Sequence, residues 1–253
     1  MPRDHAVSVQ NDGSEMTRRV PLDNVDHQHL RVARRATCDL SVNQALVVLS
    51  EFEQLQREYP ILFRRDADGE FQAVALLGLD RGENLFQREG EWSTRYVPAT
   101  LRRGPLFLGV SDEEQDDAAI IIDLDDPRVN QSDGEPLFLP QGGAAPFLQQ
   151  AAEALQIVHK GLELSRQMFG LFTELELIQP IEISVETGDG TRYRLDSFFT
   201  VGADQLVGLP GAGLEKLNRA GFLAAAIHAR SSLGNISRLI ELKTAKQAKK
   251  ADA

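Results

Sequence analysis

The sequence predicts an α+β fold, with a mainly β N-terminal half of antiparallel strands and a C-terminal half that contains helices and a β-hairpin. Two observations predict it. Runs with strand composition occupy residues 45–124, whereas apolar residues follow a helical spacing from Pro146 onward. The helices also do not alternate regularly with strands, as they would around a doubly wound parallel sheet.

The N-terminal half contains several runs with the composition of strands. Residues 80–83, with Gly82, predict a hairpin turn between strands at 71–79 and 84–87, because glycine tolerates the positive φ of such turns. The all-isoleucine triplet 120–122 predicts a strand buried on both faces. A short helix is expected over 51–59, closed by Pro60. The remaining predicted strands are 45–49, 96–97, 106–110 and 118–124.

The C-terminal half changes from strand to helical period. Pro146 opens a helix whose apolar positions run from Phe147 to Leu162, and a second helix, marked by Met168, ends before Pro180. Residues 181–199 alternate apolar and polar side chains around a turn at 188–190, which predicts the clearest hairpin of the chain. Further helices follow, with Gly221 as a left-handed cap between two of them.

The chain divides into three parts by composition. Residues 1–18 are polar and aperiodic and are expected to form a mobile arm. Residues 19–243 are expected to form a single α+β domain, with a subdivision near 145 as the alternative. Residues 244–253 form a basic tail that either extends the last helix or is disordered. Within the domain, the proline- and glycine-rich segment 125–145 is a long irregular connection, and such loops are often functional.

Composition and charge restrict the classes of partner. The formal net charge is −11 and the pI is near 5.0, so the chain repels phosphate backbones and nucleic acid is not an expected partner. Cys38 is the only cysteine, which fits a reducing compartment. The apolar runs are far shorter than the roughly 20 residues that span a bilayer, and no apolar leader is readable. We therefore expect a cytoplasmic protein that is not integral to the membrane, with the cell surface, reached without a signal, as the alternative.

Two groups of polar residues are candidates for metal or ligand binding. Asp123 and Asp125 lie at the end of the predicted strand 118–124, and carboxylates at a strand end can hold a hard cation such as Mg²⁺ or share a proton. The alternative is a turn before Pro127 whose charge Arg128 neutralises. His27 and His29 place two imidazoles on one side of an extended segment, as in many metal sites. That site would need a third ligand, and surface or capping histidines are the alternative.

Tyr96, with the neighbouring Trp92 and Arg95, is a third candidate. Aromatic and arginine side chains dominate recognition surfaces, but the same aromatic residues serve a core equally well, and the core is the favoured interpretation. The sequence also lacks the motifs for serine catalysis and for nucleotide binding. The chain contains no Gly-x-Ser-x-Gly elbow, and its glycine pairs lack the Lys-Ser/Thr that phosphate loops require.

Several stretches taken together resemble the SapC family. The most recognisable block is residues 122–129, Ile-Asp-Leu-Asp-Asp-Pro-Arg-Val, followed by Gly-Glu-Pro-Leu-Phe at 134–138. The resemblance extends over about residues 19–243 and includes the stretches 20–23, 74–79, 82–86, 95–98, 199–201 and 221–223. It implies a bacterial protein from a family named for a surface layer, and it carries over no catalytic residue. Glu135 in this block joins Tyr96, Asp123, Asp125 and Arg128 as the candidate binding residues.

Three hypotheses for function follow. The first is a non-enzymatic binding or accessory protein that takes a protein, peptide or surface-polymer partner on the face formed by 125–145 and the neighbouring strands. The second is a metal-dependent enzyme that uses His27, His29 or the Asp123/Asp125 pair. The third is a structural component of a surface layer. No cofactor is expected beyond the divalent metal of the second hypothesis, and the oligomeric state stays open.

Overall fold

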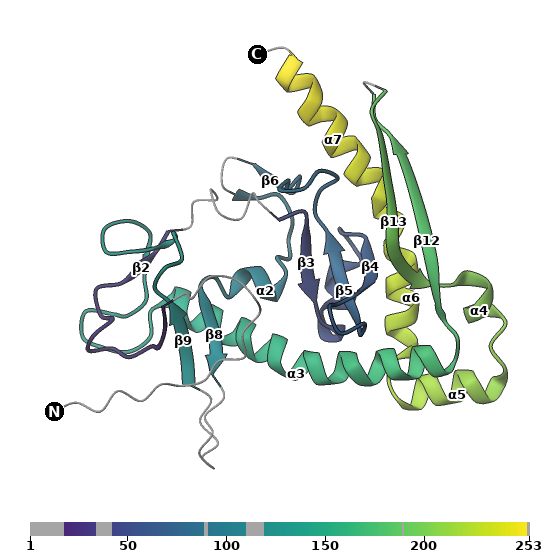
Figure 1. The fold of residues 1–253 in the computed structure, drawn as a ribbon. Coiled ribbons are helices and arrows are strands. Elements are labelled where there is room, and N and C mark those ends of the chain that lie inside the picture. The colour runs from purple at the N-terminus through teal and green to yellow at the C-terminus, as the bar shows by residue number, and fades with distance from the viewer. Residues whose placement is uncertain (1–17, 34–41, 89–90, 110–118, 189, 252–253) are drawn as a thin grey trace. The chain divides into compact units, whose positions relative to one another are not determined.

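The computed structural model describes residues 18–33, 42–88, 91–109, 119–188 and 190–251. The architecture is α+β with antiparallel sheets, as predicted (Figure 1). The chain forms two compact units, each discontinuous in sequence. Unit 1 comprises residues 1–38 and 102–156, and unit 2 comprises 39–101 and 157–253. Of the predicted N-terminal arm only Arg18 is described, and Cys38 lies outside the described residues.

Unit 1 contains two small three-stranded sheets. The first has the order β1-β9-β8, formed by β1 (Arg19–Pro21), β9 (Ala119–Asp123) and β8 (Leu106–Gly109). The second has the order β10-β2-β11, formed by β10 (Val129–Asn130), β2 (Arg31–Val32) and β11 (Glu135–Pro136). β9 is the central strand of the first sheet, where Ile121 and Ile122 are buried. The core of the unit consists of Val32, Leu106, Ile122, Leu137, Leu148, Ala151 and Leu155.

Unit 2 is built on a five-stranded antiparallel sheet with the order β12-β13-β4-β5-β3. Its strands are β12 (Ile178–Glu186), β13 (Arg192–Val201), β4 (Ile61–Arg65), β5 (Phe71–Leu76) and β3 (Gln44–Val47). The helical elements are η2 (Leu49–Glu51), α1 (Phe52–Leu55), α2 (Ala99–Arg102), α4 (Ala203–Val207), α5 (Gly211–Arg219), α6 (Leu223–Ser232) and α7 (Asn235–Ala251). β6 (Gln87–Arg88) and β7 (Glu91–Trp92) pair with each other as a separate two-stranded antiparallel sheet.

The hairpin predicted over 181–199 is confirmed. β12 and β13 pair from Ile178 with Val201 to Glu186 with Arg192, and they stand side by side as a long ribbon (Figure 1). Ile183 and Val185 are buried while Glu182 and Glu186 are exposed, so the alternation in the sequence corresponds to one buried face. Gly221 has φ +77°, which confirms its role as a left-handed cap between α5 and α6.

The prediction of two helices between 146 and 180 is wrong, because α3 (Pro146–Glu174) is a single helix of 29 residues. The apolar pattern breaks after Val158 because Gly161 and Ser165 continue the buried face without apolar side chains. A Cβ at Gly161 would lie 2.4 Å from a methyl carbon of Val48, so the helix approaches its neighbour closely there. Leu162, which the apolar pattern placed on the buried face, is 44% exposed.

Two strand predictions in the N-terminal half are also wrong. β5 pairs with β3 and β4, whereas β6 pairs with β7, so residues 84–87 do not return along 71–79. Instead, residues 77–86 form a loop in which Leu77, Leu85 and Phe86 are buried. The predicted strand at 96–97 has no regular structure and leads directly into α2. Besides local hydrogen bonds, both segments bond to residues distant in sequence: the Leu77 amide donates to the Asn43 carbonyl, and the Tyr59 hydroxyl donates to the Tyr96 carbonyl.

Candidate functional site

Unit 1 contains a cavity of about 430 Å³ on the surface formed by β2 and the segment 131–140. We call it the β2 cavity. It is lined by Gln28, His29, Leu30, Arg31, Gln131, Pro136, Phe138, Leu139 and Pro140. Five of these nine residues belong to the proline- and glycine-rich segment 125–145 that the sequence singled out.

The segment 125–145 is ordered because it wraps around β2. β10 and β11 pair with the same two residues of β2 from opposite sides, and the Leu137 amide donates to the Leu30 carbonyl at 3.1 Å. Gly134, between β10 and β11, has φ +95°, and a Cβ there would lie 2.2 Å from the Val32 carbonyl oxygen. Only glycine permits this approach, which brings the proline-rich wall of the cavity against β2.

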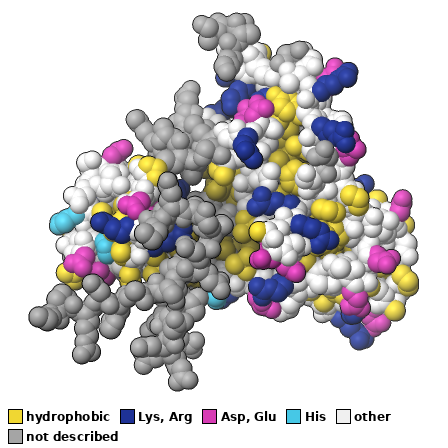
Figure 2. Space-filling model, in the orientation of Figure 1, with side chains coloured by type: hydrophobic (Ala, Val, Ile, Leu, Met, Phe, Trp, Pro, Cys, Tyr) yellow, Lys and Arg dark blue, Asp and Glu magenta, His cyan; other side chains and the backbone are white. Residues whose placement is uncertain are grey.

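The cavity has an apolar floor and a polar rim. Leu30 and Phe138 pack against the core of unit 1 and present the rest of their surface to the cavity. On the rim, Arg31 Nη1 donates to the Gly134 carbonyl at 2.7 Å, and Gln28 Nε2 donates to the Pro140 carbonyl at 3.3 Å. His29 is exposed, and Figure 2 shows histidine side chains at this part of the surface. An apolar floor with a few oriented polar groups is the composition of a recognition site.

The carboxylates at the end of β9 shape a turn. Asp123 is buried, and its Oδ1 accepts the Asp125 amide at 3.1 Å, while Asp125 Oδ2 accepts the Arg18 amide at 2.6 Å. Asp126 accepts both Nε and Nη2 of Arg128, at 2.9 and 2.7 Å. Burial alone would raise the pKa of Asp126, but its hydrogen bonds from Arg128 outweigh that effect, and the pKa lies below its ordinary value.

Two further arginines lie beside this turn, and sequence reasoning missed them. Arg19 and Arg103 both place their guanidinium groups over the ring of Phe107, 4.4 and 4.0 Å from its centroid. Burial, together with the nearby charges of Arg128 and Arg19, lowers the pKa of Arg103 to about 10. No pattern in the sequence relates these residues, because β1, β8 and the turn after β9 meet only through sheet pairing.

The two candidate histidines have different surroundings. His27 Nδ1 accepts the Asp23 amide at 3.2 Å, and Asp23 in turn accepts the amides of Val25 and Asp26. Those backbone hydrogen bonds lower the pKa of Asp23. His29 instead lines the β2 cavity. Among the described residues, no three His, Cys, Asp or Glu side chains lie close enough together to hold a metal ion.

Tyr96 and Glu135 lie in different units. The Tyr96 hydroxyl donates to Glu51 Oε1 at 3.0 Å in unit 2, and Glu51, 1% exposed, also accepts the Ala99 amide at 2.7 Å. Tyr96 packs against the core of unit 2, in line with the favoured interpretation. Glu135 begins β11, next to Pro136 of the cavity wall. Unit 1 therefore contains six of the seven candidate residues, and only His29 among them lines the β2 cavity.

Comparisons with known proteins complete the description of the chain. In the part of the chain that the structure describes, no helix combines the length and the apolar character needed to cross a bilayer. Searches of curated proteins and of solved structures give no match. A family model described as SapC matches residues 22–239, and the chain therefore belongs to the SapC family.

Proposed function

We propose that the chain is a non-enzymatic binding protein that takes a peptide segment of a protein partner in the β2 cavity. The observation that carries the proposal is the cavity itself, an apolar floor of proline, leucine and phenylalanine with Arg31, His29 and two glutamines at its rim. Aromatic and arginine side chains are enriched at the centres of protein interfaces, and fixed proline backbones lower the entropy that binding costs.

The polar groups nearby support binding rather than turnover. The three carboxylates at the end of β9 accept hydrogen bonds from backbone amides or from Arg128, and these bonds fix the turn that leads into β10. The backbone carbonyls of Gly134 and Pro140 hold Arg31 and Gln28 in place. Pre-oriented rim groups of this kind give specificity at a small cost in ordering.

The test is selection of random twelve-residue peptides displayed on phage, followed by titration calorimetry of the consensus peptide. Leu139→Glu places a charge in the apolar floor, whereas Val25→Glu makes the same change at a residue of unit 1 that is 79% exposed and does not line the cavity. We expect Leu139→Glu to weaken the peptide at least about tenfold and Val25→Glu to leave its affinity unchanged. Failure to enrich any consensus, or equal affinities for the two variants, would count against the proposal.

A further inference from the structure

We propose that unit 2 has a second binding site, a groove that takes a short basic, apolar-anchored segment of a partner protein in extended conformation. The groove has a volume of about 810 Å³ and lies between α3 and the strands β3 and β5. Volumes of this size are typical of ligand sites. Most of its lining residues come from α3, from β5 and from the turn between β4 and β5.

The floor of the groove is apolar. Phe71 of β5 stacks on Phe169 of α3 with ring centroids 6.0 Å apart, and both rings line the groove together with Val47 of β3. Leu162 lines it as well and is 44% exposed. Val47 and Phe169 are 2% and 6% exposed, so Leu162 and the half-buried Phe71 offer most of the apolar surface that a partner can cover, and these two side chains are the anchor points.

The rim of the groove is acidic. Asp66, Asp68 and Glu70 lie in the turn between β4 and β5 and line the groove. Asp66 holds the turn together, because it accepts the amides of Asp68 and Glu70 at 3.0 and 2.9 Å and Gln72 Nε2 at 3.0 Å. Asp68 and Glu70 are exposed, and within the described chain neither carboxylate has a hydrogen bond or ion pair. Two free carboxylates therefore face a partner.

The cations near the groove are already engaged. Arg166, which lines it, pairs with Glu163 one helical turn away. Arg65 stacks over Phe71 at 4.1 Å and donates to the Gly69 carbonyl at 2.6 Å. The charged groups that are free to contact a partner are thus the carboxylates of Asp68 and Glu70, and charge complementarity favours a basic partner.

The groove has a defined length, and its two ends differ in charge. Its helical wall runs from residue 162 to 173, which is about 17 Å at a rise of about 1.5 Å per residue and matches about five residues of extended chain. The acidic turn lies near Phe169, because Phe71 directly follows that turn and stacks on that ring. At the other end, Ser165 accepts the Leu49 amide at 2.9 Å. The partner's basic residues therefore belong near Phe169 and its apolar ones near Leu162.

The partner binds through side chains rather than by adding a strand to β3. The Leu46 carbonyl of β3 already accepts the Thr100 hydroxyl at 2.7 Å, and the Asn43 carbonyl accepts the Leu77 and Gly78 amides at 2.8 and 3.2 Å. The Leu46 carbonyl in the middle of β3, and the Asn43 carbonyl just before it, are thus already satisfied within unit 2. The occupant must be held by the apolar floor and the free carboxylates.

Fluorescence anisotropy with labelled, capped hexapeptides tests the proposal. The probes contain three leucines and three arginines in both orders, and the control peptides carry glutamate in place of arginine. We expect at least one arginine peptide to bind with a dissociation constant below about 100 µM, with an affinity that falls as salt rises. The proposal is overturned if no arginine peptide binds, or if the glutamate peptides bind equally well.

Protein variants locate the site. Gly170 lines the groove, and a Cβ there would have no heavy atom within 4 Å, so a side chain can be added at this position; we choose Gly170→Trp to obstruct the groove and Gly170→Ala as its matched control. Gly170→Trp should abolish binding and Gly170→Ala should preserve it. Asp68→Asn with Glu70→Gln should weaken binding about fivefold and remove most of the salt dependence. Wild-type affinity in Gly170→Trp, with circular dichroism showing a folded protein, would refute the assignment.

Discussion

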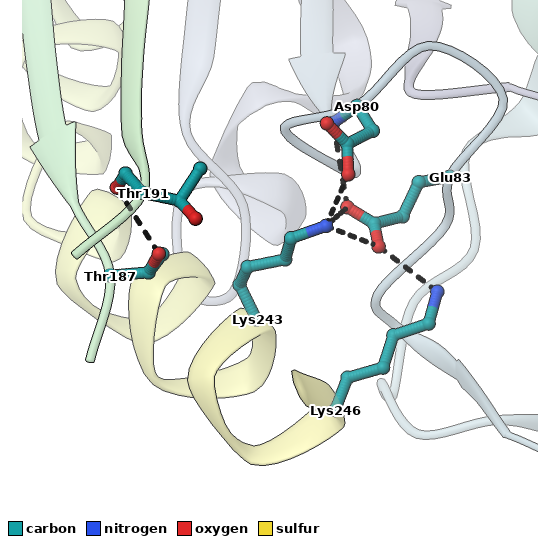
Figure 3. Close-up of polar contacts among 6 residues, drawn as sticks. All are labelled: Asp80, Glu83, Thr187, Thr191, Lys243 and Lys246. Carbon is teal, nitrogen blue, oxygen red and sulfur yellow. Dashed lines mark hydrogen bonds and ion pairs between the residues drawn. The ribbon is translucent and has the colours of Figure 1, made fainter. Parts of the chain in front are cut away.

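Lys243 is nearly buried in a cluster of charges, and its replacement by methionine tests how α7 is held to the rest of unit 2. Its ammonium group donates to both carboxylate oxygens of Glu83 at 2.9 Å and also contacts Asp80 (Figure 3). Lys243 is 5% exposed and Glu83 7% exposed. The pair therefore joins α7 to the loop 77–86 through a desolvated ion pair.

The loss of stability in Lys243→Met depends on the contacts that Glu83 keeps in that variant. Removing one partner of a buried ion pair costs about 3–5 kcal/mol, because the other charge is left without compensation. Lys246 still donates to Glu83 Oε1 at 3.0 Å, and Asp80 is more than half exposed, so we expect the lower end, about 3 kcal/mol. With an m-value of about 2 kcal/mol per molar urea, the unfolding midpoint should fall by about 1.5 M.

Trp92 is the only tryptophan of the sequence and packs against the core of unit 2, so its fluorescence in urea reports the unfolding of that unit. Adding Glu83→Gln to Lys243→Met removes the uncompensated charge, and the double variant should recover at least about 1.5 kcal/mol relative to Lys243→Met alone. A loss below about 0.5 kcal/mol in Lys243→Met would refute the reasoning. A double variant less stable than Lys243→Met would refute it as well.

The effect of Lys243→Met should also depend on pH with a definite sign. Burial alone would raise the pKa of Glu83, but hydrogen bonds from Lys243 and Lys246 outweigh it and hold the pKa below the ordinary value of 4.5. Burial would lower the pKa of Lys243, but hydrogen bonds to Asp80 and Glu83 outweigh it and hold the pKa above its ordinary value of 10.5. The stabilisation is thus complete between the two ordinary values. It should be lost as the pH falls through the folded-state pKa of Glu83.

Three further predictions concern single contacts. Ser232→Ala removes the hydroxyl that accepts the Ile61 amide at 2.9 Å and should cost about 1–3 kcal/mol in urea unfolding followed by Trp92; an unchanged midpoint would contradict it. Gly134→Ala should strongly increase the rate of amide hydrogen exchange in unit 1. Gly143→Ala, also at positive φ but with open space around it, should lower the free energy of unfolding by only about 1 kcal/mol and raise the exchange rate much less. Equal exchange rates in the two variants would contradict the prediction. Tyr96→Phe should destabilise unit 2 by about 1 kcal/mol without changing peptide affinity at the β2 cavity; weaker peptide binding would contradict it.

Local patterns predicted part of this fold correctly. The alternation from Ile181 to Phe199 predicted the long hairpin, because one of its faces is buried and the other is solvated. Gly221 was predicted as a cap because its positive φ is a property of one residue and its immediate neighbours. The segment 125–145 stood out by composition alone, and the structure places most of the β2 cavity wall there.

Contacts between distant residues were beyond the reach of such patterns. Residues 80–83 were predicted as a hairpin turn between strands at 71–79 and 84–87 because Gly82 suits such a turn, but Lys243, 160 residues away, holds Glu83 in the loop 77–86. The continuity of α3 was missed because its buried face continues through Gly161, which packs closely against Val48 without an apolar side chain. Arg19 and Arg103 meet on Phe107 only after β1, β9 and β8 have paired.

Photocrosslinking in cells tests the proposed role of the β2 cavity most directly. A photoreactive benzoylphenylalanine is introduced at Leu139 in the cavity floor or, as a control, at Val25, which is exposed outside it. After irradiation, mass spectrometry identifies the adducts of each variant. We predict a discrete protein adduct from position 139 that is absent from position 25. No adduct at position 139, or the same adducts from both positions, would contradict a partner bound in the β2 cavity.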